Sequence, residues 1–189
     1  MASIYTVKYR RKRDGLTDYK KRMKLLLGSK PRLVVRKSLK NLTLQLIEFQ
    51  PKGDKVIITS SSKELSKHGW KASTGNISAA YLTGYLLAKK AKAQTECVLD
   101  IGQYTSVKGC TLYAAAQGAL DGGLKVPLSK EIVPNMQRIR GEHIAAYAKQ
   151  LKKDKDRYQK QFAKYIKAGL DPETLPAHFD QVKKSIGGQ

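Results

Sequence analysis

The sequence predicts an α/β fold: a small mixed sheet made of an antiparallel three-strand meander plus a fourth strand, with helices packed on it, a basic N-terminal arm and a helical C-terminal extension. Residues 41–49 (NLTLQLIEF) alternate between apolar and polar side chains, which is the period of a half-buried strand. From residue 55 to 120, strand-like and helix-like patterns alternate, as in a sheet covered by helices. Lys and Arg gather in residues 1–40, which hold 14 of the 37 in the chain but only two acidic residues.

The N-terminal segment is expected to be an arm followed by a helix. Residues 1–16 are expected to be extended. A short helix is expected from about residue 18 to 27, with Thr17 as its N-cap. Three leucines and Met23 give this helix an apolar side, while its lysines and Arg22 give it a basic side. We therefore expect the helix to dock on the core and still face a polyanion.

Three strands are expected next, at residues 32–36, 41–49 and 55–59. In the second strand, Leu42, Leu44 and Leu46 would all face the core, because alternate side chains of a strand share one face. The connections at 38–40 and 51–54 are short, so the strands are expected to pair as an antiparallel meander. The first connection carries lysine, which makes the tip of that hairpin basic.

Two apolar helices, at residues 77–93 and 111–120, are expected to cover the sheet, with a buried fourth strand at 97–101 between them. Both helices are rich in small residues, which would let them pack closely. These elements complete a core domain of residues 17–130. In residues 131–189 apolar side chains recur at helical spacing but are few, which predicts a helical extension that packs against the core or against a partner.

The positive charge of the chain points to a polyanionic partner. The formal net charge is +22, and six of the nine arginines lie in residues 1–40. Nucleic-acid phosphates relieve the repulsion among such charges, and the counterions they release supply much of the binding free energy. Unpaired RNA bases stack on arginine and on rings such as Tyr5, Tyr9 and Tyr19, which lie among the basic residues. A solvated tail that only aids solubility and a histone-like compactor of DNA are the alternatives.

Membranes and oxidising compartments are not expected. Cys97 and Cys110 form neither a C-x-x-C pair nor a disulfide framework, which is typical of a reducing, intracellular compartment. The first twenty residues lack the apolar centre of a secretory signal. The longest apolar stretch, residues 79–88, is shorter than the about 20 residues that a transmembrane helix needs. Residues 8–14 lack the apolar face of a membrane-surface helix, so no membrane partner is expected.

Sequence motifs for catalysis are missing as well. The three histidines lie far apart, and the chain has no zinc-binding spacing, phosphate-binding loop or nucleophile elbow. We therefore expect no enzymatic activity, no metal, no cofactor and no small-molecule substrate. The alternative is a metal-dependent nuclease of an RNase H-like α/β fold, in which Asp100 at the end of a buried strand would hold Mg²⁺. Such chemistry needs several converging carboxylates, and the simpler interpretation is that Asp100 accepts hydrogen bonds from loop amides.

Several segments match a known family, in order, along nearly the whole chain. They are Pro31–Ser38, Gly69–Trp70, Thr74–Asn76, Ala80–Gly84, Val98–Gly102, Gly118–Leu124 and Arg138–Tyr147. Through them the chain resembles the archaeal-type ribosomal protein L18 family of the large subunit, whose eukaryotic counterpart is ribosomal protein L5. The resemblance implies a non-enzymatic protein of cytoplasmic ribosomes that holds 5S ribosomal RNA (rRNA) in the central protuberance. It also implies contacts with large-subunit (23S-type) rRNA and with a neighbouring 5S-binding ribosomal protein.

The expected RNA-binding residues combine the basic segments with this resemblance. Phosphate contacts from the arm and the first hairpin would position a folded RNA, while rings and base-edge contacts would recognise unpaired bases. The residues expected to bind RNA are Tyr9, Arg10, Arg11, Lys12, Arg13, Tyr19, Arg22, Lys30, Arg32, Arg36, Lys37, Ser38, Lys40, Asn41, Lys71, Thr74, Asn76, Tyr104 and Lys108.

Overall fold

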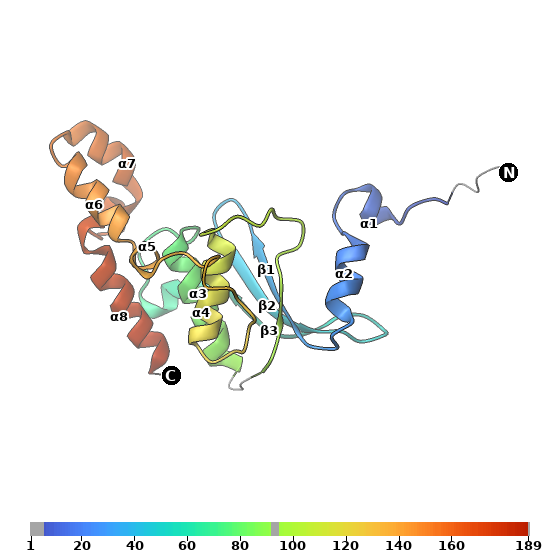
Figure 1. Cartoon of the computed structure of the whole chain (residues 1–189). Coiled ribbons are helices and arrows are strands. Elements are labelled where there is room, and N and C mark those ends of the chain that lie inside the picture. The colour runs from blue at the N-terminus through green and yellow to red at the C-terminus, as the bar shows by residue number, and fades with distance from the viewer. Residues whose placement is uncertain (1–5, 92–94, 189) are drawn as a thin grey trace.

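A computed structural model describes residues 6–91 and 95–188 and confirms the α/β class (Figure 1). Within these residues a four-stranded sheet has the strand order β3-β2-β1-β4. The strands are β1 (Arg32–Lys37), β2 (Leu42–Glu48), β3 (Lys55–Ser61) and β4 (Val98–Asp100). Strands β1, β2 and β3 form the predicted antiparallel meander, and β4 pairs with β1 in parallel. Tyr5 and the expected helix end near residue 93 lie outside the described residues.

Helices α3 (Ile77–Ala91) and α4 (Thr111–Asp121) cover one face of the sheet (Figure 1). They share a buried apolar cluster with Leu42, Leu44 and Leu46 of β2, as the alternating pattern predicts. A short 3-10 helix, η1 (Ser62–His68), follows β3 and leads towards α3. The main core therefore lies between the sheet and these two helices.

The two helices touch through their backbones. A Cβ atom on Gly84 of α3 would lie 1.9 Å from the carbonyl oxygen of Ala115. A Cβ atom on Gly118 of α4 would lie 2.0 Å from the carbonyl oxygen of Tyr81. Only glycine fits at either position, so these two small residues set how closely α3 and α4 approach.

The C-terminal extension packs against the core. Its elements are α5 (Met136–Arg140), α6 (Glu142–Leu151), α7 (Lys155–Lys167), η2 (Pro172–Thr174) and α8 (Leu175–Gly187). Ile139, Leu175 and Phe179 are buried in one cluster with Trp70 and Tyr81 of the core domain. Figure 1 shows α6 and α7 as a projecting pair at the end of the molecule opposite to the N-terminal segment.

The N-terminal segment differs from its expected form. Residues Arg10–Arg13 form a helical turn, α1, where an extended arm was expected. Helix α2 (Tyr19–Leu26) begins with Asp18 as its N-cap, not Thr17, because the Asp18 carboxylate accepts a 3.1 Å hydrogen bond from the amide of Lys21. The expected apolar docking of α2 is wrong: α2 buries no residue, and Met23 is 61% exposed. Polar contacts hold this helix instead.

Candidate nucleic-acid interface

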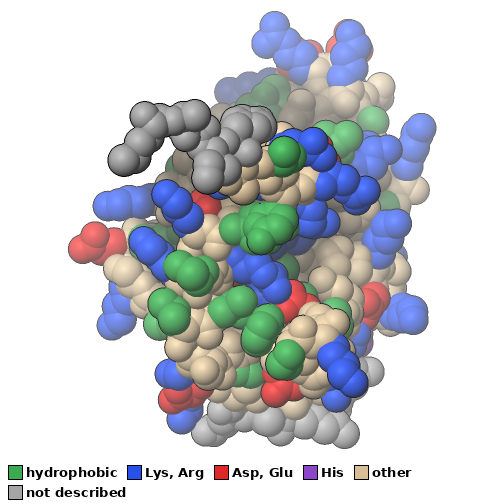
Figure 2. All heavy atoms as spheres, turned by 90° about the vertical axis from the view of Figure 1, so that its right-hand side faces the viewer, with side chains coloured by type: hydrophobic (Ala, Val, Ile, Leu, Met, Phe, Trp, Pro, Cys, Tyr) green, Lys and Arg blue, Asp and Glu red, His purple; other side chains and the backbone are tan. Residues whose placement is uncertain are grey.

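Helix α1 presents consecutive cationic side chains to solvent. Residues Arg10–Arg13 are all exposed, as are the lysines of α2. The rings of Tyr9 and Tyr19 lie beside this turn with their centroids 5.2 Å apart. Figure 2 shows the face of the molecule that carries α2, where Lys and Arg side chains surround exposed hydrophobic groups. The arrangement offers charges for phosphates and rings for unpaired bases.

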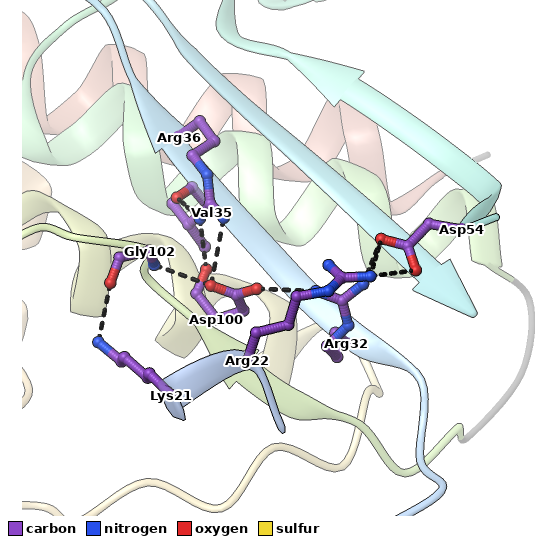
Figure 3. A network of polar contacts seen from close by, with 8 residues as sticks. All are labelled: Lys21, Arg22, Arg32, Val35, Arg36, Asp54, Asp100 and Gly102. Carbon is purple, nitrogen blue, oxygen red and sulfur yellow. Dashed lines mark hydrogen bonds and ion pairs between the residues drawn. The ribbon is translucent and has the colours of Figure 1, made fainter. Parts of the chain in front are cut away.

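Behind α2, an ion-pair network joins the sheet to the N-terminal segment (Figure 3). The guanidinium of Arg32 donates to Asp100 Oδ2 at 3.0 Å and to Asp54 Oδ2 at 2.7 Å. Arg22 on α2 donates to Asp54 Oδ1 at 2.8 Å. Lys21 reaches further along the same side and donates from Nζ to the carbonyl oxygen of Gly102 at 2.8 Å. These contacts fix α2 against the sheet without burying its apolar side.

The network removes Arg32 from the expected RNA contacts. Its side chain is only 3% exposed and lies between two carboxylates, so it cannot reach a phosphate. A buried charge is tolerated when it is paired and hydrogen-bonded, and Asp54 and Asp100 supply both. Partial burial opposes ionisation of Asp54, but hydrogen bonds from Arg22 and Arg32 outweigh it and lower the pKa of Asp54 below its ordinary value. Arg32 therefore helps to position α2, because it shares the Asp54 carboxylate with Arg22 of that helix.

Both carboxylate oxygens of Asp100 likewise accept hydrogen bonds from within the protein. Its Oδ1 accepts from the amide of Gly102 at 2.8 Å and from Arg36 at 3.2 Å, while Arg32 occupies Oδ2. Arg36 also donates to the backbone carbonyl oxygen of Asp100 at 2.9 Å. The expected hydrogen bond from a loop amide is confirmed, and two arginine contacts are added. In the described part of the chain no group of three or more His, Cys, Asp or Glu side chains could hold a metal ion.

A second group of expected residues converges at the β1–β2 hairpin. The Thr74 hydroxyl lies 2.8 Å from both the carbonyl oxygen of Lys40 and Oδ1 of Asn41. Tyr104 reaches the hairpin from the loop after β4 and donates from its hydroxyl to the carbonyl oxygen of Lys37. Ser38 closes the turn by donating from its hydroxyl to the carbonyl oxygen of Asn41 at 2.9 Å. Three distant segments thus meet at one end of the sheet.

Loop residues near this hairpin are also anchored. Asn76 caps α3, since its Oδ1 accepts a 2.7 Å hydrogen bond from the amide of Ala79. Lys71 is held by its backbone, whose amide donates to His178 Nε2 of α8 at 3.2 Å. The Lys71 side chain itself is exposed. These hydrogen bonds therefore hold the backbone at Lys71 and Asn76 in place beside the hairpin.

Two of the expected residues lie apart from both groups. Lys30 pairs with Glu96, with 2.7 Å between Nζ and Oε2. Nζ of Lys108 lies 3.7 Å from Oε2 of Glu131, and both side chains are exposed. These ion pairs offset part of the charge that Lys30 and Lys108 would offer to a phosphate.

Sequence reasoning did not anticipate the Asp54 and Asp100 pairs, although one signal was present. Arg32 and Arg36 lie on the same face of a strand with three apolar residues between them, and a buried arginine requires a carboxylate partner. Asp100 ends the neighbouring strand and was therefore the natural candidate. Lys21 gave no comparable signal, because its partner is a backbone carbonyl group far away in the chain.

Over almost its whole length the chain is similar in sequence to known proteins. Residues 3–96 match a family model described as "Ribosomal large subunit proteins 60S L5, and 50S L18". The chain is 46% identical over 188 residues to the large ribosomal subunit protein uL18 of Methanococcus maripaludis, and the match covers 98% of this chain and 97% of that protein. In the described residues, no helix has the length and apolar character needed to cross a membrane.

Proposed function

Because this chain belongs to the family of large-subunit ribosomal proteins that includes 60S L5 and 50S L18, we propose that it binds 5S rRNA and helps attach it to the large-subunit rRNA in the central protuberance. Family membership makes it a structural constituent of the large ribosomal subunit with rRNA as its partner. The choice of 5S rRNA, the contact with 23S-type rRNA and that with a neighbouring 5S-binding ribosomal protein are parts of the proposal.

The observation that carries the proposal is the unneutralised charge of α1. Among the described residues, none of the four cationic side chains of Arg10–Arg13 forms an ion pair with a carboxylate, whereas Arg22, Arg32 and Arg36 all do. Arg11 is held by a 2.9 Å hydrogen bond from its Nε to the Thr17 hydroxyl. A fold that pairs its other N-terminal arginines leaves these free for an external polyanion.

The mechanism follows from the two kinds of group present. Cationic side chains that displace counterions from phosphates supply affinity and orientation but no sequence selectivity. Selectivity comes from unpaired bases, which stack on exposed rings and present their edges to polar side chains. Tyr9 is exposed beside α1. The polar side chains of Ser38, Asn41 and Thr74 lie at the β1–β2 hairpin, at one end of the sheet. The network behind α2 holds these parts in one geometry.

A titration of 5S rRNA against salt tests the proposal. The parent protein should prefer 5S rRNA to an unrelated structured RNA and to duplex DNA. In the triple variant Arg10→Ala, Arg11→Ala, Arg13→Ala, the slope of log affinity against log salt should become shallower by about 2–3, since each of the three lost phosphate contacts removes roughly 0.7–0.9. Lys130→Ala serves as a control, because this exposed lysine is not among the residues expected to bind RNA. Equal binding of all three nucleic acids would contradict the proposal, and unfolding of the triple variant would assign α1 to the core.

A further inference from the structure

A cavity of about 400 Å³ opens where the core domain meets the C-terminal extension. Its walls come from the tip of the β1–β2 hairpin, the loop at residues 71–76 and helix α7. Three lysines line it, one from each of these segments: Lys40, Lys71 and Lys164. None of the described residues that line it is acidic. The volume is within the range of about 300–1,000 Å³ found for ligand pockets.

Two walls of this lysine cavity, the loop at residues 71–76 and the hairpin tip, are held together without a ligand. Thr74 bridges the loop to the hairpin through its contacts with Lys40 and Asn41. The indole of Trp70 donates from Nε1 to the carbonyl oxygen of Ser73 at 3.2 Å and is itself buried. A Cβ atom on Gly75 would lie 3.1 Å from the carbonyl oxygen of Lys40, which shows how closely loop and hairpin pack. A preformed site loses less entropy when a ligand binds.

The three lysines keep their positive charge without a carboxylate partner. In the part of the chain that the structure describes, no ion pair forms with Lys40, Lys71 or Lys164. Three ammonium groups without carboxylates around one cavity attract an anion with several oxygen atoms, such as a phosphate. The charge of the site therefore specifies the polar part of its ligand.

The cavity also has an apolar part. Leu39 at the hairpin tip is fully exposed and lies at its edge, and Tyr165 of α7 lines it beside Lys164. A phosphate alone gives an exposed leucine no partner, but a nucleobase has a flat apolar face that can cover it. Taking a paired base out of a helix costs unpairing and unstacking energy, so we expect the ligand to come from an unpaired position.

We propose that this cavity takes one unpaired nucleotide of the bound RNA, with its phosphate between Lys40, Lys71 and Lys164 and its base against Leu39. The inference rests on the proposed function in that it assumes RNA as the partner. It gives the C-terminal extension a part in RNA binding, because Lys164 completes the site from α7.

Chemical probing of the RNA bound to the full chain tests the proposal, with a matched pair of variants. Lys164→Ala removes one cavity lysine, and Lys160→Ala makes the same change on the same exposed helix outside the cavity. We expect Lys164→Ala to weaken binding roughly tenfold, the effect of losing one charged hydrogen bond, and to expose one unpaired nucleotide that the parent protein protects. Leu39→Ala should expose the same nucleotide. Lys160→Ala should retain the protection.

Two results would overturn the inference. One is equal weakening by Lys164→Ala and Lys160→Ala with no nucleotide exposed by either, which would indicate a diffuse attraction of the helix for RNA. The other is exposure by Lys164→Ala of a paired segment, which would indicate a contact with a duplex backbone. If 5S rRNA is not preferred, the proposed function fails separately. The comparison of the two lysine variants is then made on whichever structured RNA binds most tightly.

Discussion

Arg32 shows how one buried charged side chain can hold a helix against a sheet through shared carboxylate partners. It lies in a strand whose neighbours are buried leucine and valine, and it is almost completely enclosed. Two carboxylates, on Asp54 and Asp100, hold its guanidinium from opposite sides. Removing one partner of a buried ion pair leaves an uncompensated charge and costs about 3–5 kcal/mol. The network thus ties the position of α2 to the stability of the sheet.

The substitution Asp100→Asn should lower the free energy of unfolding by roughly 3 kcal/mol, because the buried guanidinium of Arg32 loses one of its two countercharges. Urea denaturation followed by circular dichroism measures this change. Asp14→Asn makes the same chemical change at an exposed position and should stay within about 0.5 kcal/mol of the parent. Equal effects of the two substitutions would mean that the network does not support the fold.

Asp54 should make the stability depend on acid pH. Its pKa in the folded chain lies below the ordinary value of 3.8, because the hydrogen bonds from Arg22 and Arg32 outweigh the opposing effect of burial. A lowered folded-state pKa gives stabilisation that is complete above the unfolded-state pKa, here about 4, and is lost as the pH falls through the folded-state pKa. The stability advantage of the parent over Asp54→Asn should therefore shrink below about pH 4. Urea denaturation across this range checks it, and an advantage independent of pH would contradict it.

At the scale of elements, periodic patterns in the sequence identified the sheet and its two covering helices but not the attachment of α2. The leucines of β2 are buried because alternate side chains of a strand share one face, and here that face packs against α3 and α4. The apolar side of α2 also has helical spacing, yet none of its residues is fully buried, and Arg22 and Lys21 hold the helix through partners distant in the chain. Local patterns carry no information about such pairings. The same limit applies to the lysine cavity, whose three walls meet only in the folded chain.

The crossing of α3 and α4 depends on Gly84. The substitution Gly84→Ala should lower the free energy of unfolding by about 3 kcal/mol, because its Cβ atom would lie 1.9 Å from the backbone of Ala115 and the helices would have to separate. Alanine favours a helix over glycine by about 1 kcal/mol, so helix propensity works against this loss. Gly28→Ala is the matched control, since a Cβ atom there meets nothing within 4 Å. Thermal unfolding measures both variants, and a neutral Gly84→Ala would mean that the backbones are not in contact.

On the scale of the whole molecule, cationic groups lie at two ends and the core domain lies between them. Helix α1 lies at one end and the α6–α7 pair at the other (Figure 1). Between them the apolar cluster around Trp70 contains residues of both the core domain and the extension. Lys183 of α8 adds a polar link, because its Nζ donates to the Tyr81 hydroxyl at 2.7 Å. The proposed attachment of 5S rRNA to the large-subunit rRNA would use such a connection between the core domain and the extension.

This continuity predicts that the core domain and the extension unfold as one unit. Phe179 of α8 is buried against Tyr81, so Phe179→Ala should lower the free energy of unfolding by about 3–5 kcal/mol. The single tryptophan reports docking of the extension, because the ring of Trp70 stacks on His178 with 5.2 Å between centroids. In urea, tryptophan fluorescence and far-ultraviolet circular dichroism should give coincident transitions for the parent and for Phe179→Ala. Phe49→Ala, at a half-exposed position, should change the free energy of unfolding obtained from either signal by no more than about 1 kcal/mol. If Phe179→Ala moved the fluorescence transition and left the circular dichroism transition in place, the extension would be an independent unit and the two ends would not be rigidly coupled.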